Sequence, residues 1–167
     1  MATVNIAYAA SATITVAPEN VASSSTFVAG VESGVIDNTS NKYVDAIVGG
    51  TWTSGTTPTA NTQVLIYVLS VRDDAPTYPD VFDGTSSAET LTSAGVGRGF
   101  LKLAAIIDVD SNTSNRAYDV SFTVAALFGG VMPLKWSLFI THNSGVNSNS
   151  TAGNHVWKTT GITYTVV

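Results

Sequence analysis

The chain has 167 residues, with 12 acidic and 7 basic side chains and a net charge of −5. Charged residues make up only 11% of the sequence, which instead contains 23 Thr, 18 Ser and 11 Asn. These numbers indicate a single domain and exclude a coiled coil and a charged disordered tail. The absence of cysteine excludes a disulfide scaffold. The basic residues are scattered along the chain, which argues against nucleic-acid binding.

The first 24 residues are rich in Ala, Ser and Thr and contain one alternating stretch at 12–16, which ends before Pro18. We expect residues 1–24 to form an N-terminal arm or first strand with a weak hydrophobic anchor. The start lacks the basic residues and apolar run of a signal peptide, and no run of about 18 apolar residues follows. We therefore expect a protein made in the cytoplasm, without a membrane partner.

The next part of the chain predicts short strands joined by turns. Residues 26–31 and 42–52 are strand candidates, and the second contains the pair Gly49-Gly50, which indicates a bulge or a close backbone approach. Residues 63–71 are apolar on both faces, which is typical of a central strand between two packed layers.

Residues 72–99 form the longest stretch without a periodic pattern, and they contain Pro76, Pro79 and Gly84. Such a long loop inside one domain is usually functional or folded over the surface as an insertion. The glycine-rich run at 95–99 has neither a preceding strand nor a following helix, so it favours a flexible loop or bulge over a phosphate-binding loop.

The remaining sequence predicts four more strands. Residues 101–109, 118–124 and 134–140 alternate apolar and polar side chains, and 155–167 form the last strand. Residues 125–130 predict one helical turn closed by glycine.

About eight strands and no long amphipathic helix predict an all-β fold, an antiparallel β-sandwich or jelly roll. We expect the arm at 1–24 to precede one sandwich domain at 25–167 that carries the long loop at 72–99.

Two histidines flank a Ser/Asn/Gly-rich loop at 143–154. A zinc site built on His142 and His155 would lack a third ligand at a recognisable spacing. We interpret both side chains as polar caps of the loop.

Acidic side chains give a second set of candidate ligands. Asp108, Asp110 and Asn112 alternate as the first ligands of a calcium loop do, but the later Gly and Glu of such a loop are missing, which favours a solvated strand face. The long loop contains Asp73, Asp74, Asp80 and Asp83, and whether these side chains bind calcium stays open. We predict no metal site and no cofactor.

Catalytic chemistry finds little support in the sequence. There is no Gly-x-Ser-x-Gly motif, and the three glutamates, at 19, 32 and 89, lie in predicted loops rather than as a pair across a cleft. We predict no catalytic residue and no enzyme.

Aromatic side chains are the remaining candidates, because exposed rings bind sugars or partner subunits. Trp136 shares its face with apolar neighbours and is expected in the core. Trp157 alternates with Val156, Ile162 and Tyr164, so it is either an exposed platform or part of a core against a second layer. The predicted interface or ligand contacts are Trp52, Tyr78, Phe82 and Trp157.

Five segments in order carry a family resemblance, namely 52–58 (WTSGTTP), 79–84 (PDVFDG), 125–133 (AALFGGVMP), 139–145 (FITHNSG) and 150–157 (STAGNHVW). From about residue 25 onward the chain resembles small β-rich virion structural proteins of tailed bacteriophages. No single segment carries the resemblance without the others.

The resemblance implies a capsid decoration, or cement, protein on the capsid exterior of the virion. It implies the major capsid protein as partner and a homo-oligomer, with a trimer favoured, and it supplies no catalytic residues. Two alternatives remain open: a jelly-roll glycan- or receptor-binding module of the virion, and a tail tube or tail-tip subunit.

Overall fold

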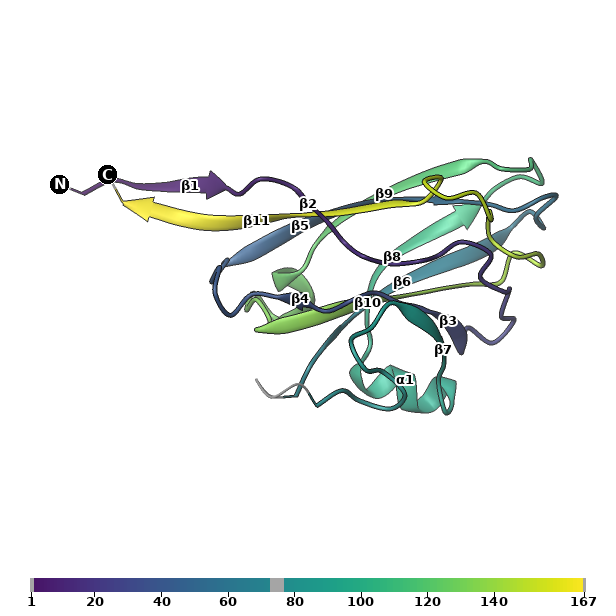
Figure 1. Cartoon of the computed structure of the whole chain (residues 1–167), viewed down its shortest axis with the longest axis horizontal. Coiled ribbons are helices and arrows are strands. Elements are labelled where there is room, and N and C mark those ends of the chain that lie inside the picture. Colours follow the sequence, from purple (N-terminus) through teal and green to yellow (C-terminus); the bar gives the residue numbers. More distant parts are fainter. Residues whose placement is uncertain (1, 73–76, 167) are drawn as a thin grey trace.

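The computed structural model describes residues 2–72 and 77–166, which form two antiparallel sheets packed face to face (Figure 1). The prediction of an all-β sandwich is confirmed. Asp73 and Asp74 lie outside the described residues, so whether they take part in binding calcium stays open. Within the described ranges, no helix is long and apolar enough to cross a membrane.

The first sheet has the strand order β1-β11-β5-β9, and β2 also pairs with β11. Its strands are β1 (Val4–Tyr8), β2 (Ala12–Thr13), β5 (Asp45–Thr53), β9 (Ala117–Thr123) and β11 (Val156–Val166). The second sheet has the order β7-β3-β10-β6-β8, and β4 also pairs with β10. Its strands are β3 (Ala29–Glu32), β4 (Ile36–Asp37), β6 (Thr62–Ser70), β7 (Ser87–Thr90), β8 (Lys102–Val109) and β10 (Lys135–His142).

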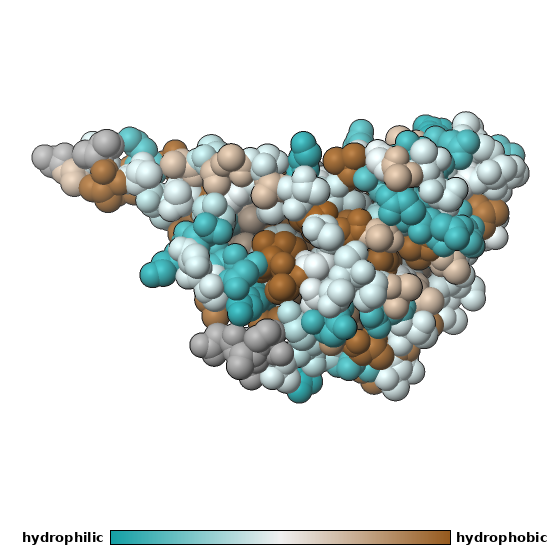
Figure 2. Space-filling view, in the orientation of Figure 1, coloured by the Kyte–Doolittle hydropathy of each residue, from teal (hydrophilic) through white to brown (hydrophobic). Residues whose placement is uncertain are grey.

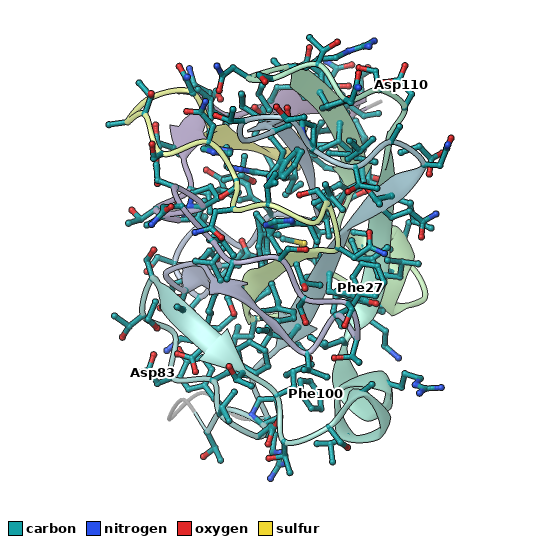
Figure 3. The ribbon with its side chains drawn as sticks, turned by 90° about the vertical axis from the view of Figure 1, so that its right-hand side faces the viewer. Phe27, Asp83, Phe100 and Asp110 are labelled. Carbon is teal, nitrogen blue, oxygen red and sulfur yellow. The ribbon has the colours of Figure 1, made fainter. Side chains whose placement is uncertain are left out.

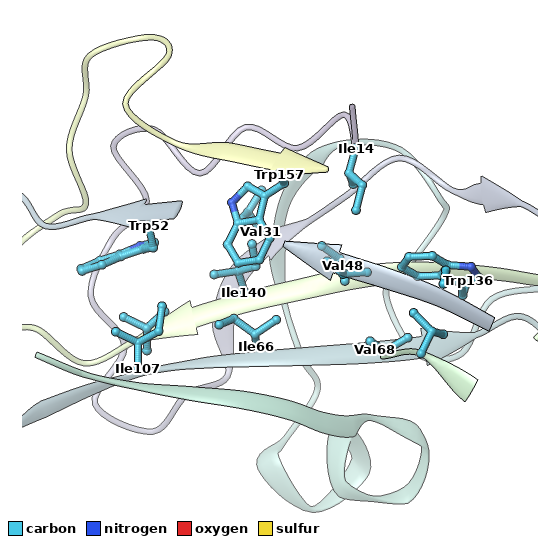
Figure 4. Close-up of a cluster of buried hydrophobic side chains, with 14 of the residues drawn as sticks. Ile14, Val31, Val48, Trp52, Ile66, Val68, Ile107, Trp136, Ile140 and Trp157 are labelled. Carbon is cyan, nitrogen blue, oxygen red and sulfur yellow. The ribbon is translucent and has the colours of Figure 1, made fainter. Parts of the chain in front are cut away.

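The main core lies between the sheets and is built from alternate residues of the strands, whose side chains point inward (Figure 4). It contains all three tryptophans, Trp52, Trp136 and Trp157, and none of them is more than 2% exposed. Together with the β-branched side chains of the central strands they remove a large apolar area from water, which is the main driving force for folding.

The glycine pair of β5 serves this core. Gly50 lies directly opposite Trp157 in the pairing of β5 with β11, and a Cβ at Gly50 would overlap the Trp157 ring. Gly49 has no atom within 4 Å of where its Cβ would be. Of the two alternatives predicted for the pair, the close approach applies to Gly50.

The N-terminal arm is fastened to the body rather than free. Ile14, only 3% exposed, is the predicted hydrophobic anchor, and its N–H donates to the Trp157 carbonyl. Further along, the Val21 N–H donates to the Ser148 hydroxyl at 2.8 Å. The arm leaves the body only at β1.

The long loop at 72–99 is more ordered than predicted. It contains β7, which pairs with β3, and it leads into a short helix, α1 (Ala94–Phe100). The predicted loop at 95–99 is therefore wrong. Ser93 caps α1 by accepting from the Val96 N–H, and the buried Gly97 lets the helix approach Leu91 closely, so tertiary packing overrides the low helix propensity of glycine.

Two further predictions concern the second half of the chain. The helical turn is confirmed as η1 (Ala125–Phe128), which ends at Gly129 with φ of 72°. The single apolar face predicted for 101–109 is broken, because the register of β8 against β6 shifts by one residue between Leu103 and Ala105. This bulge leaves Leu103 45% exposed on the outside of the sheet, while Ile107 stays in the core.

Candidate interaction surfaces

A two-stranded ribbon projects from one end of the sandwich and carries both ends of the chain (Figure 1). It consists of β1 and of residues 162–166 of β11, which pair from Val4 opposite Val166 to Tyr8 opposite Ile162. The pairing of β5 with β11 ends at Ile162, so beyond that residue the ribbon has no third strand.

One face of the ribbon is apolar and bare. Directly paired residues share a face, and so do alternate residues along a strand. Because Trp157 points into the core, the even-numbered residues of β11 point away from it. The apolar face of the ribbon comprises Val4, Ile6, Tyr8, Ile162, Tyr164 and Val166, of which all but Ile162 are 59–69% exposed. Figure 2 shows hydrophobic residues on this projection.

The ribbon also lacks the features that protect exposed strands. Natural edge strands are usually guarded by lysine, proline or other charged residues, and an isolated two-stranded ribbon is only marginally stable in water. Residues 2–9 and 159–166 contain no charged residue and no proline. A bare, uncharged ribbon of this kind is therefore a candidate interaction surface.

A second apolar surface lies on the outside of the second sheet, next to α1. It is a groove of about 440 Å³. Figure 3 shows Phe27, one of its lining residues, just above α1. We call it the α1 groove, and it is lined by Phe27, Leu65, Tyr67, Leu91, Arg98 and Leu103, among others.

The aromatic candidates from the sequence are not surface platforms. Trp52 and Trp157 are 0% and 2% exposed, and Phe82 is 5% exposed in a second cluster beneath the 72–99 segment. Tyr78 packs against that same cluster. Of the two alternatives expected for Trp157, the structure shows the core position, because the sheet turns its Trp157 face, not its Ile162 and Tyr164 face, toward the partner sheet.

The two histidines hold loop backbone, as predicted for polar caps. His142 Nε2 lies 3.0 Å from the Val21 carbonyl, and His155 Nε2 lies 3.1 Å from the Asn149 carbonyl. His155 Nδ1 accepts from the Thr53 N–H at 3.2 Å. Burial lowers the pKa of both imidazoles, so they are neutral at pH 7.

The acidic side chains of the long segment are also occupied structurally. Within the described ranges, the carboxylates of Glu32, Asp83 and Glu89 lie within 4.8 Å of one another. The fully buried Glu32 accepts from the N–H groups of Asp83 and Gly84 at 3.1 and 3.0 Å, and burial raises its pKa. Asp80 accepts from the Thr92 hydroxyl.

The other acidic run lies on the surface. Asp108 and Asp110 are exposed, as the solvated-face interpretation predicts. Asp110 forms an ion pair with Arg116 at 3.2 Å and accepts from the Tyr118 hydroxyl, and Gln63 donates to Asp108. These contacts account for both carboxylates without an ion.

No protein-family model and no curated protein matches the chain. Among solved structures, it is similar to the C-terminal domain of EclA, a sugar-binding protein, with 7% identity and a TM-score of 0.31 over 98% of this chain and 79% of that chain. It is also similar to the CBM22-1 xylan-binding domain of Xyn10C from Paenibacillus barcinonensis, with 8% identity and a TM-score of 0.33 over 81% and 70% of the two chains. Likeness at this level carries no argument about a ligand.

The sequence analysis missed the ribbon as a site. Apolar residues do alternate with others at 4, 6 and 8 and at 162, 164 and 166, but this pattern is also typical of a strand with one face in the core. Only the pairing of the two strands shows that no second layer covers their apolar face.

Proposed function

We propose that this protein is a non-catalytic structural subunit of a virus particle, a capsid decoration protein that binds the capsid exterior as a homo-oligomer. The observation that carries the proposal is the bare apolar face of the ribbon. A marginally stable ribbon with an exposed apolar face gains stability when another protein covers it, which supports a role as one part of an assembly.

Three further features support the proposal. The five segments at 52–58, 79–84, 125–133, 139–145 and 150–157, taken in this order, resemble those of phage virion proteins. Few charged side chains suit a protein packed against neighbours, because ordering long charged side chains costs conformational entropy. The buried ionisable groups found in the described part of the chain, His142, His155 and Glu32, already have structural partners.

Attachment to particles tests the proposal. Capsids of a tailed phage that encodes the chain, assembled without it, are mixed with the protein and sedimented. Wild-type protein should sediment with capsids, whereas the double variant Ile6→Thr, Tyr164→Thr should stay in the supernatant, because threonine preserves strand propensity while removing apolar area. Val131→Thr is the matched control, since Val131 is 70% exposed and lies outside the ribbon.

The outcomes separate the alternatives. Equal sedimentation of wild type and the double variant would overturn the role of the ribbon. Binding to isolated tails but not to capsids would instead identify a tail subunit. Deletion of residues 2–9 gives a second variant that keeps Ile14 and its contact with Trp157, so the body should remain folded while attachment is lost.

A second candidate function, glycan recognition, is favoured by a polar hollow of about 300 Å³ at the end of the sandwich away from the ribbon. Its walls present uncharged amide and hydroxyl groups, including Asn20, Thr56, Asn115, Asn147 and Thr151. Binding of host polysaccharide that Asn147→Ala abolishes, without a change in melting temperature, would favour this function over capsid attachment.

A further inference from the structure

The chain has two unpartnered apolar surfaces that cannot cover each other. The apolar face of the ribbon belongs to the first sheet and points away from the core. The α1 groove lies on the outer face of the second sheet, so it points in the opposite direction. Contact between them therefore requires two copies of the chain.

The α1 groove is shaped by local structure rather than left open by chance. The bulge in β8 turns Leu103 outward, opposite Tyr67, and this pair forms part of the groove wall. Phe27 has φ of 56°, a conformation that is uncommon for a bulky residue and that needs support from its surroundings. That support comes from Ser24, whose hydroxyl accepts from the N–H of Val28 and whose carbonyl accepts from the N–H of Phe27.

We propose that the ribbon of one copy packs its apolar face against the α1 groove of the next copy, head to tail. The inference rests on the proposed role as an assembly subunit and adds what the ribbon binds. Contacts between two different surfaces build rings when the rotation between copies closes. A ring of three agrees with the trimer expected from the resemblance.

The chemistry of the two surfaces matches. The ribbon contains no charged residue, and Arg98 is the one charged side chain among the groove residues. Arg98 lies at the groove in the last turn of α1, where its guanidinium can stack on a tyrosine ring such as Tyr8 or Tyr164 of the incoming ribbon. Because the ribbon offers no carboxylate, the exposed guanidinium of Arg98 has to keep its contact with water at the edge of the interface.

A head-to-tail arrangement covers more apolar surface on each copy than a pair of ribbons packed back to back. The five bare side chains of the apolar face expose on the order of 500 Å², whereas each partner of a stable complex buries roughly 800 Å². A back-to-back pair would use this face once and leave the α1 groove open. In a ring each copy gives a ribbon and receives one, so both surfaces are covered.

Cross-linking tests the contact directly, because the chain contains no native cysteine. One pool of full-length protein carries Tyr164→Cys on the ribbon, and a second pool, distinguished by an affinity tag, carries Leu103→Cys in the α1 groove. The pools are mixed and treated with a short bis-maleimide, both free at high concentration and bound to capsids. Val131→Cys replaces either variant as the control, since Val131 is exposed and outside both surfaces.

The proposal expects cross-links between Tyr164→Cys and Leu103→Cys copies well above those with Val131→Cys. Dominant Tyr164→Cys homodimers would overturn it in favour of back-to-back ribbons, and cross-links no stronger than the control would overturn it outright. If mixed cross-links form in solution while the protein does not bind capsids, the head-to-tail contact stands and the capsid role fails. If the protein binds capsids without mixed cross-links, the reverse holds.

Discussion

Replacing Gly50 with alanine adds one methyl group at the most crowded point of the core. The nearest atoms to the added Cβ all belong to the Trp157 ring, and all of them are closer than real Cβ contacts allow. The ring is 2% exposed and enclosed between the two sheets, so it cannot move away without disturbing its neighbours. Gly50 has no unusual backbone angle that would add a second effect.

The expected cost follows from this overlap. Adding a methylene-sized group to a packed core destabilises a protein by about 1–3 kcal/mol, and we expect the upper half of that range because a whole indole ring must shift. For a chain of this size each kcal/mol lowers the melting temperature by roughly 2–4 °C. Gly49→Ala is the matched control, since its Cβ meets nothing within 4 Å. It should be neutral or slightly stabilising, because alanine restricts the unfolded chain.

Urea unfolding followed by far-UV circular dichroism measures both variants. A second comparison uses Trp157→Leu, which is destabilising alone but frees the space opposite Gly50. In that background Gly50→Ala should cost much less than in the wild type, giving a coupling between the two sites of the size seen for residues in contact. Equal costs for Gly49→Ala and Gly50→Ala, or full additivity with Trp157→Leu, would refute the argument.

Further predictions concern buried ionisable groups and the α1 cap. Burial lowers the pKa of His142 and His155, so below about pH 6.5 the unfolded chain binds protons at these residues that the folded chain does not bind. The free energy of unfolding should therefore fall from pH 7 towards pH 5, by up to about 1.4 kcal/mol per pH unit for each histidine. The raised pKa of Glu32 acts in the opposite sense, because the stability that it contributes at low pH is lost as pH rises. Glu32→Gln lacks this contribution, so its urea midpoint should fall more steeply with decreasing pH than that of the wild type. Parallel curves for the two proteins would contradict this. At pH 7, Glu32→Gln should itself cost about 1–3 kcal/mol, because its amide would face the Asp83 N–H instead of accepting from it. Ser93→Ala should cost about 1 kcal/mol by removing the cap of α1, and unchanged hydrogen exchange in α1 would count against the cap.

Much of the fold could be predicted because alternation with a period of two is a local property. The apolar run of β6 predicted a central strand, and the Gly-Gly sequence after Phe128 predicted the left-handed end of a helical turn. The alternation at 134–140 predicted a strand at β10 but not its burial on both faces. Local patterns did not predict α1, since three glycines in seven residues favour a loop until Leu91 and Leu101 pack around Gly97.

The candidate sites were harder to predict, because the exposure of a side chain depends on segments far away in sequence. The pattern of β11 separates Trp157 from Ile162 and Tyr164, but it cannot say which set meets the second sheet. The sequence left both alternatives open for Trp157, and the structure buries Trp157 opposite Gly50 and leaves Tyr164 bare. The pairing of β1 with the last residues of β11 then collects two ordinary alternating strands into one exposed apolar face.

By itself, the sequence determined the class of this protein: one β-rich domain, with neither a cysteine-based site nor a cationic surface, because composition and periodicity act residue by residue. Tertiary structure decided which face of each strand is covered, where the 72–99 segment folds back, and that the ribbon and the α1 groove remain open. These features depend on contacts between residues far apart in the sequence. The paired residues of β1 and β11, for example, are more than 150 positions apart, and no local pattern encodes such contacts.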